Sequence, residues 1–152
     1  PHAWAGCRAT RGALRGRHYY EARVVDDGLC RVGWATRAAT LELGLDAHGV
    51  GYGGTGKKSH ARSFDDYGGA YAKGDVVGCY VDCDAGTCGY TRNGEDLGTA
   101  FELPPSMRGA ALYPCVCLKN AEMRLAFGGA SGALQHAPPA GYAPLGDAPS
   151  DA

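Results

Sequence analysis

Long apolar runs are absent from this sequence, and so is any marked excess of charge of one sign. Charged residues make up 20% of the chain and the formal net charge is -1. No stretch is long and apolar enough to predict a transmembrane helix, and the start shows no signal-peptide pattern. The chain opens with the residues PHAW and without Met, as a piece excised from a longer protein would. We expect no membrane association.

A CxxC motif is also missing, although the chain has seven cysteines. Cys79, Cys83 and Cys88 with His60 are the nearest approach to a zinc-ligand set, and their spacings do not fit a zinc knuckle. An odd cysteine count does not favour a disulfide framework. Most of the cysteines lie in strand-like segments, where a thiol behaves as a small apolar group. We therefore expect no metal and a reducing compartment, the nucleus and the cytoplasm.

A complete phosphate-binding loop is lacking as well. The segment GYGGTGKKSH, Gly51 to His60, looks like one, because glycines precede a lysine. A lysine, Lys58, stands where the magnesium-binding Ser or Thr is needed, and Ser59 comes one residue late. No apolar residues at helical spacing follow, so no helix N-terminus would face a phosphate. We expect no nucleotide cofactor, and we interpret the glycines as a strand and loop where two backbones pass closely.

Apolar residues alternate with polar ones along most of the chain, which is the period of β-strands. In HYYEARVV this places Tyr20, Ala22 and Val24 on one face, and in CRVGWAT it places Cys30, Val32 and Trp34 on one face. Asp27-Gly28 between these segments predicts a hairpin. Further joints with turn residues are CDAG, NGED and KNAE.

Short strands about every ten residues, with no confident helix, predict an all-β fold of antiparallel strands, either a sandwich or a barrel. Only residues 37–44 could form a short helical turn. The composition changes after Gly128, where Ala, Gly and Pro dominate. We expect a domain over residues 1–128 and an irregular tail or linker over 129–152 that contributes nothing to the core.

Six blocks, taken in order, resemble the SPRY domain family. They are GRHYYEARV, CRVGWAT, GYGGTGKKSH, GDVVGCYVDCDAG, RNGEDLGTAF and LYPCVCL, which together run from about Gly16 to Phe127. The blocks GLCRVGWAT, GYGGTGKKSH, FDDYG and LKNAE are most similar to the SPRY insert of a DEAD-box RNA helicase. The double lysine after the glycines is a feature that most SPRY domains lack.

The resemblance implies a β-sandwich of two antiparallel sheets that binds a protein or peptide through loops at one end and has no catalytic residues. A DEAD box, a Ser-Ala-Thr motif and a complete phosphate loop do not occur in the chain, so any ATPase activity would belong to a parent helicase. We expect the domain to be a monomer.

Positively charged residues are the candidates for partner binding, because cations clustered in a loop favour an acidic protein segment or a phosphate. They are Lys57, Lys58, His60, Arg62, Arg31 and Arg37. The alternative interpretation is a solvated loop whose charges serve solubility. A second group, Arg8, Arg11, Arg15 and Arg17, either widens the basic surface or forms the junction with a helicase lobe.

Two further groups receive structural interpretations. Trp34 alternates in phase with Val32, so we expect it in the core rather than at a contact surface. Asp82 and Asp84 lie at a turn, where paired aspartates cap their own backbone and are not expected to be catalytic.

Three functions remain open at this level. The leading one is a protein-interaction module, the second an auxiliary RNA-binding surface that assists a parent helicase, and the third an independent enzyme. Aromatic platforms interleaved with basic residues are not evident, which disfavours RNA.

Overall fold

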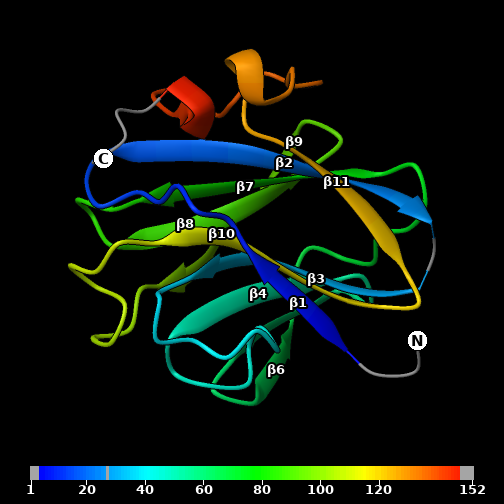
Figure 1. Cartoon of the computed structure of the whole chain (residues 1–152), viewed down its shortest axis with the longest axis horizontal. Coiled ribbons are helices and arrows are strands. Elements are labelled where there is room, and N and C mark those ends of the chain that lie inside the picture. Colours follow the sequence, from blue (N-terminus) through cyan, green and yellow to red (C-terminus); the bar gives the residue numbers. More distant parts are fainter. Residues whose placement is uncertain (1–3, 27, 148–152) are drawn as a thin grey trace.

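The computed structural model describes residues 4–26 and 28–147. Strands form two layers packed face to face (Figure 1), and the described part contains no α-helix. The first sheet has the strand order β1 (Ala5–Arg8), β10 (Tyr113–Lys119), β3 (Leu29–Ala35), β4 (Gly49–Gly53), β5 (Lys57–His60) and β6 (Ser63–Asp66). The second has the order β11 (Glu122–Ala126), β2 (Arg17–Asp26), β7 (Val76–Asp82), β8 (Thr87–Arg92) and β9 (Glu95–Glu102). No helix in the described part is long and apolar enough to cross a membrane.

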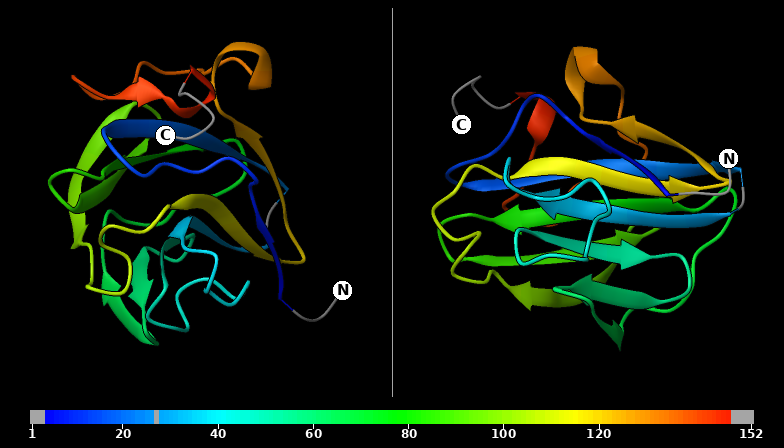
Figure 2. Two further views of the ribbon diagram at one scale, coloured as in Figure 1. Left: turned by 60° about the vertical axis from the view of Figure 1, so that its left-hand side comes forward. Right: turned by 60° about the horizontal axis from the view of Figure 1, so that its bottom comes forward.

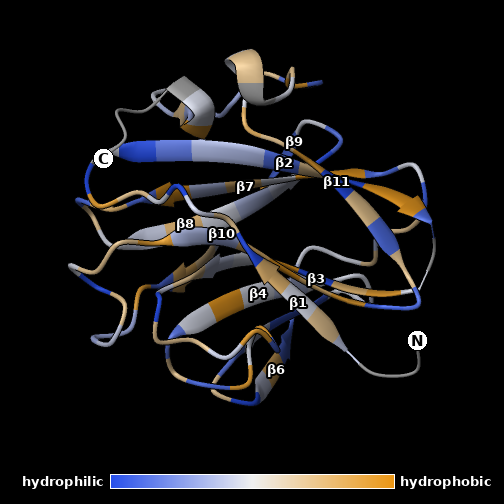
Figure 3. Cartoon of the chain, viewed as in Figure 1, coloured by the Kyte–Doolittle hydropathy of each residue, from blue (hydrophilic) through white to orange (hydrophobic). Residues whose placement is uncertain are grey.

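The alternation seen in the sequence decides which side chains lie between the sheets. Tyr20 and Trp34, from facing strands, are fully buried and meet edge to face, with ring centroids 5.0 Å apart. Figure 3 shows the same alternation of apolar and polar residues along β11. The predicted sandwich, the inner faces of β2 and β3 and the core position of Trp34 are therefore confirmed.

The turn chemistry is confirmed at two of the joints. Asn93 and Gly94 both have positive φ between β8 and β9. After β7, Asp82 Oδ1 accepts the N–H groups of Asp84 at 3.1 Å and Ala85 at 2.8 Å. This aspartate caps its own turn, as expected.

The predicted hairpin at Asp27-Gly28 is wrong. Asp27 lies outside the described residues, but β2 pairs with β7 and β11, whereas β3 pairs with β10 and β4. The connection therefore passes from one sheet to the other. Gly28 lies against the backbone of Asn120, so closely that a side chain would overlap the Asn120 carbonyl. Lys119 to Glu122 makes the same crossing, from β10 to β11, so the two crossings pack together.

The segment over residues 129–147 is irregular, as expected, with short 3-10 turns at Gly129–Ser131 and Leu145–Asp147. The expectation that it contributes nothing to the core is wrong, because Leu145 is 1% exposed and belongs to the main core cluster. A two-residue strand, β12 (Ala143–Pro144), pairs in parallel with the start of β2. Figure 2 shows the segment lying over the outer face of the second sheet. The division into a domain and a tail at residue 128 stays a prediction.

A buried carboxylate holds this segment to the sheet. Glu21 is 2% exposed on the outer face of β2. It accepts the backbone N–H of Gln135 at 2.7 Å, the backbone N–H of His136 at 3.0 Å and the hydroxyl of Tyr19 at 2.7 Å. Charge-assisted bonds of this kind are the stronger hydrogen bonds of proteins, so we infer that they fix the segment in place.

Candidate protein-docking surface

One row of residues crosses the outer face of the first sheet. The strand register pairs Arg31 of β3 with Gly53 of β4, Gly53 with Lys57 of β5, and Lys57 with Asp66 of β6. Directly paired residues project from the same side of a sheet. Two of the six predicted residues, Arg31 and Lys57, therefore share one face, and only a glycine separates them.

Arg31 lies between two aromatic rings on this face. Its guanidinium is 4.4 Å from the ring centroid of Trp4 and 5.1 Å from that of Phe64. Its Nη1 donates a hydrogen bond to the carbonyl of Leu43 at 3.2 Å. Guanidinium groups are attracted to the faces of aromatic rings. These contacts hold the Arg31 side chain in place at the centre of this face.

The exposed large apolar side chains of the described residues are Leu29, Leu41 and Phe64, each 43% exposed. All three belong to this region. Leu29 precedes Arg31 by two residues and so projects from the same face, and Phe64 lies beside Arg31. Leu41 lies against Gly6, which pairs with Cys117, the neighbour of Arg31 in the register. We call this set the Arg31 patch, defined as Trp4, Leu29, Arg31, Leu41, Lys57 and Phe64.

Lys57 carries its own counter-ion. Its Nζ lies 2.7 Å from Oδ1 of Asp66, and this contact lowers the pKa of the Asp66 carboxyl. The sequence places no acid next to the lysines, but the β5–β6 hairpin brings Asp65 and Asp66 opposite Lys58 and Lys57. An exposed pair of this kind contributes little to stability, so Lys57 remains able to exchange partners.

Lys58 and His60 project from the other face of β5. The Nζ of Lys58 donates to the carbonyl of Ala100 at 2.7 Å and lies 5.3 Å from the ring centroid of Phe101. The His60 ring is 6.3 Å from the same Phe101 ring, and its Nδ1 is 3.1 Å from the carbonyl of Gly49. These two side chains join β5 to β9 at the edge of the sandwich and do not extend the Arg31 patch.

Arg62 and Arg37 lie in different loops. Arg62 is in the β5–β6 turn, and Arg37 follows β3, where its guanidinium is 5.3 Å from the ring centroid of Tyr113. The structure thus brings Arg31 together with Lys57, and Lys58 together with His60, and it leaves Arg37 and Arg62 apart from both pairs. A shared docking role for the six stays a prediction.

The β5–β6 turn holds two residues other than glycine at positive φ. Ala61 has φ 48° and Arg62 has φ 66°, as a two-residue turn between paired His60 and Ser63 requires. Their N–H groups donate to the carbonyls of Asp46 at 3.0 Å and Gly44 at 2.9 Å. Backbone bonds to the neighbouring loop therefore hold the turn.

Replacing both turn residues, Ala61→Asn with Arg62→Gly, should raise the free energy of unfolding by about 1 kcal/mol, because Asn and Gly tolerate positive φ. Chemical denaturation measures the change. Gly94→Ala, in the turn that already has the Asn-Gly sequence, should lower stability by a similar amount. A loss of stability in the Asn-Gly variant would show that the turn is not strained.

Three of the four arginines in the second basic group make contacts within the fold. Arg8 donates to the carbonyls of Thr36 and Ala39, both at 3.2 Å, and Arg11 donates to that of Gly146 at 3.2 Å. Arg17 pairs with Asp82 at 3.2 Å. These contacts are internal to the described residues, and they place none of the three in the Arg31 patch.

All seven cysteines lie within the described residues, and all are free thiols. Burial raises the pKa of Cys88 and of Cys115 to about 12, which keeps both as unreactive thiols near neutral pH. Among residues 4–26 and 28–147, no group of three or more His, Cys, Asp or Glu side chains is placed to hold a metal ion.

The fold of two antiparallel sheets is consistent with a match to a protein-family model, that of the SPRY domain, over residues 17–130. The chain belongs to the SPRY family. The resemblance in the sequence is thereby confirmed, and the chain is a domain of a family of binding modules rather than of catalysts.

Similar proteins include RNA helicases. The SPRY chain is 50% identical over 125 residues to "ATP-dependent RNA helicase DDX1" of Xenopus laevis and 53% identical over 126 residues to "ATP-dependent RNA helicase Ddx1" of Drosophila melanogaster, in each case over 82% of this chain. It is 33% identical over 141 residues to "Heterogeneous nuclear ribonucleoprotein U-like protein 2" of Mus musculus, over 84% of this chain. The matches cover only 17% of each helicase and 19% of the mouse protein.

Four members of the Arg31 patch were not among the predicted site residues: Trp4, Leu29, Leu41 and Phe64. Positive charge in the sequence indicates basic residues at a docking surface but not apolar ones. Phe64 alternates with Asp66 in SFDD, which could have indicated that it shares a face with an exposed acid. No local sequence signal could have indicated that Trp4 contacts Arg31. Trp4 directly precedes β1 and Arg31 lies in β3, and β10 lies between these two strands in the sheet.

Proposed function

We propose that this SPRY domain is the non-catalytic protein-interaction module of an ATP-dependent DEAD-box RNA helicase, and that a partner protein docks on the Arg31 patch. The observation that carries the proposal is the gathering of the exposed large apolar side chains around a stacked arginine. Tryptophan, arginine and other aromatic residues supply most of the binding energy at protein interfaces.

The similar proteins also favour a binding role for this domain rather than a catalytic one. A segment like this one occurs in proteins named as helicases and in one named as a ribonucleoprotein. A segment shared by both is better explained by binding than by unwinding. The nucleus and the cytoplasm as locations, and the monomeric state of the domain, stay predictions.

The chemistry of the patch describes the partner. Leu29, Leu41 and Phe64 would contact apolar side chains, while Arg31 and Lys57 would pair with carboxylates. A segment with apolar residues flanked by Asp or Glu therefore fits this face. Trp4 and Phe64 each turn one ring face to Arg31, so stacking of RNA bases is less favoured than protein contact.

Affinity capture with two charge-reversal variants tests the proposal. Arg31→Glu should reduce the recovery of specific partners at least about tenfold, as loss of a central interface arginine does. Arg124→Glu, an exposed arginine on the second sheet, should leave the recovery unchanged. Nuclease treatment before capture separates protein contacts from contacts made through RNA.

Arg31 also donates a hydrogen bond to the carbonyl of Leu43, so its replacement could lower stability. The melting temperature of each variant must therefore be compared with that of the unchanged protein. Phe64→Ser, which removes only a partly exposed ring, should lose the same partners with little effect on melting. Equal recovery by all the variants would contradict docking on the Arg31 patch. Tight binding of single-stranded RNA that Arg31→Glu abolishes would favour the RNA-binding alternative.

A further inference from the structure

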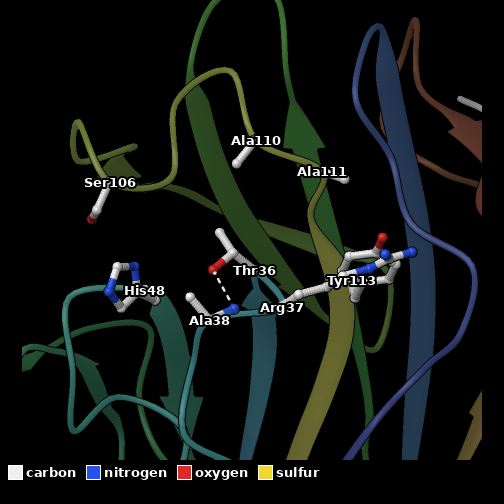
Figure 4. Close-up of a pocket in the computed structure, with 8 residues that line it drawn as sticks. All are labelled: Thr36, Arg37, Ala38, His48, Ser106, Ala110, Ala111 and Tyr113. Carbon is white, nitrogen blue, oxygen red and sulfur yellow. Dashed lines mark hydrogen bonds between the residues drawn. The ribbon is translucent and has the colours of Figure 1, made fainter.

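Two hollows lie where β3 ends and β10 begins, and the second borders the Arg31 patch because Leu41 lines it. The first has a volume of about 560 Å³ and is walled by the loop after β3, by His48 and by the loop from Ser106 to Ala111 (Figure 4). The second, of about 530 Å³, follows β1 and the residues after it. Both volumes fall in the range of binding pockets in proteins.

A single pair of side chains lies between the hollows. Arg37 and Tyr113 line both of them, and the guanidinium of Arg37 lies 5.3 Å from the Tyr113 ring centroid. Tyr113 is 6% exposed and starts β10, where it pairs with Ala35. The sheet therefore fixes the ring, and the ring supports the guanidinium from one side.

Arg37 is the charged group available to a ligand here. The side chain of Arg37 is exposed and stacks on the ring of Tyr113. Among the residues that the structure describes, it has no hydrogen-bond or ion-pair partner. Arg8, which lines the second hollow, is occupied by the carbonyls of Thr36 and Ala39. A stacked guanidinium keeps its N–H donors in a fixed plane, which suits a carboxylate.

The charged side chains that line the hollows are basic. Neither is lined by Asp or Glu among the described residues, whereas Arg8, Arg37 and His48 contribute donors. The nearby carboxylate of Asp46 accepts the N–H groups of Thr40 at 2.6 Å and His48 at 2.9 Å, so it is engaged within its own loop. The walls otherwise present small side chains, such as Ala38, Ala110 and Thr10, together with Leu41 in the second hollow.

We propose that the two hollows form one groove, which adjoins the Arg31 patch at Leu41 and is centred on Arg37, and that this groove binds an acidic extended peptide segment of a partner. One side-chain carboxylate of the segment pairs with Arg37, and the small residues on either side of it occupy the two hollows. A strand rises about 3.3 Å per residue, so a five-residue extended segment has a length of roughly 16 Å.

Peptide titration followed by amide chemical shifts tests this assignment. The probe is the acetylated and amidated peptide Ala-Ala-Glu-Ala-Ala, and the matched control replaces its Glu with Gln. We expect the Glu peptide to bind weakly and to shift the amides of Ala38, His48 and Ala110, with the Gln peptide binding at least about fivefold more weakly. Arg37→Gln should remove the difference between the peptides, while Arg124→Gln and Arg31→Glu should preserve it.

Several results would overturn the proposal: no shifts with the Glu peptide, equal binding of the two peptides, or shifts centred on Arg31 and Lys57, which do not line the groove. Arg37 is exposed, so Arg37→Gln should melt at the temperature of the unchanged protein, and that measurement shows that the fold is intact. Retention of the Glu preference by Arg37→Gln would equally contradict it. The outcome does not depend on partner capture by the Arg31 patch.

Discussion

Leu145→Ala should lower the free energy of unfolding by about 3 kcal/mol, the cost of removing a fully buried leucine from a core that cannot collapse around the gap. Leu145 is 1% exposed and packs in the main core although it belongs to the Ala, Gly and Pro-rich segment. The following residue is held too, since Gly146 donates its N–H to the carbonyl of Phe127 at 2.6 Å. Urea denaturation measures the change.

The matched control is Leu41→Ala, the same substitution at a side chain that is 43% exposed. It should cost less than about 1 kcal/mol. If the two variants lose equal and small amounts of stability, residues 129–147 are not part of the folded core, and the packing of this segment on the second sheet is wrong.

Glu21→Ala should destabilise the domain by about 2–3 kcal/mol, because hydrogen bonds to a buried charged group are among the strongest in proteins. The substitution removes the acceptor for the N–H groups of Gln135 and His136 and for the Tyr19 hydroxyl. Hydrogen exchange should then speed up at residues 135 and 136 before it does so in β7 and β8.

Glu95→Ala, at an exposed position of β9, is the control and should change stability by less than about 0.5 kcal/mol. Unchanged exchange at Gln135 and His136 in the Glu21 variant would mean that other contacts hold the segment to β2.

The strands and their buried faces could be predicted from the sequence, because alternation is a local signal. Tyr20, Ala22 and Trp34 lie in the core where the pattern places them. The partner of each strand is not a local property. Asp27-Gly28 has the residues of a hairpin, yet the chain crosses between the sheets there. The reason is that β2 pairs with β7 in one sheet and β3 pairs with β10 in the other.

Alternation also could not show that another segment covers the outer face of the second sheet. Tyr19 and Glu21 alternate out of phase with the core residues, and in an uncovered sheet they would face water. The segment over 129–147 covers them, so both are at most 2% exposed. The low apolar content of this segment gives no sign in the sequence that it packs on the sheet. Its packing depends mainly on one leucine and on backbone N–H donors.

The candidate docking surface depended on register in the same way. Positive charge identified Arg31 and Lys57 but could not show that Asp66 pairs with Lys57, nor that Trp4 and Phe64 enclose Arg31. These neighbours come from four different parts of the chain. Their meeting is a consequence of the order β1-β10-β3-β4-β5-β6, which only the structure shows.

Site-specific photo-crosslinking tests most directly whether the Arg31 patch is the docking surface. A photoreactive amino acid is placed at position 64 and, as the control, at position 124 on the other sheet, in the protein as the cell makes it. Docking on the Arg31 patch predicts a covalent adduct with a discrete protein partner from position 64, lost when Arg31→Glu is added, and none from position 124. Adducts of equal yield from both positions, or none from position 64, would contradict it.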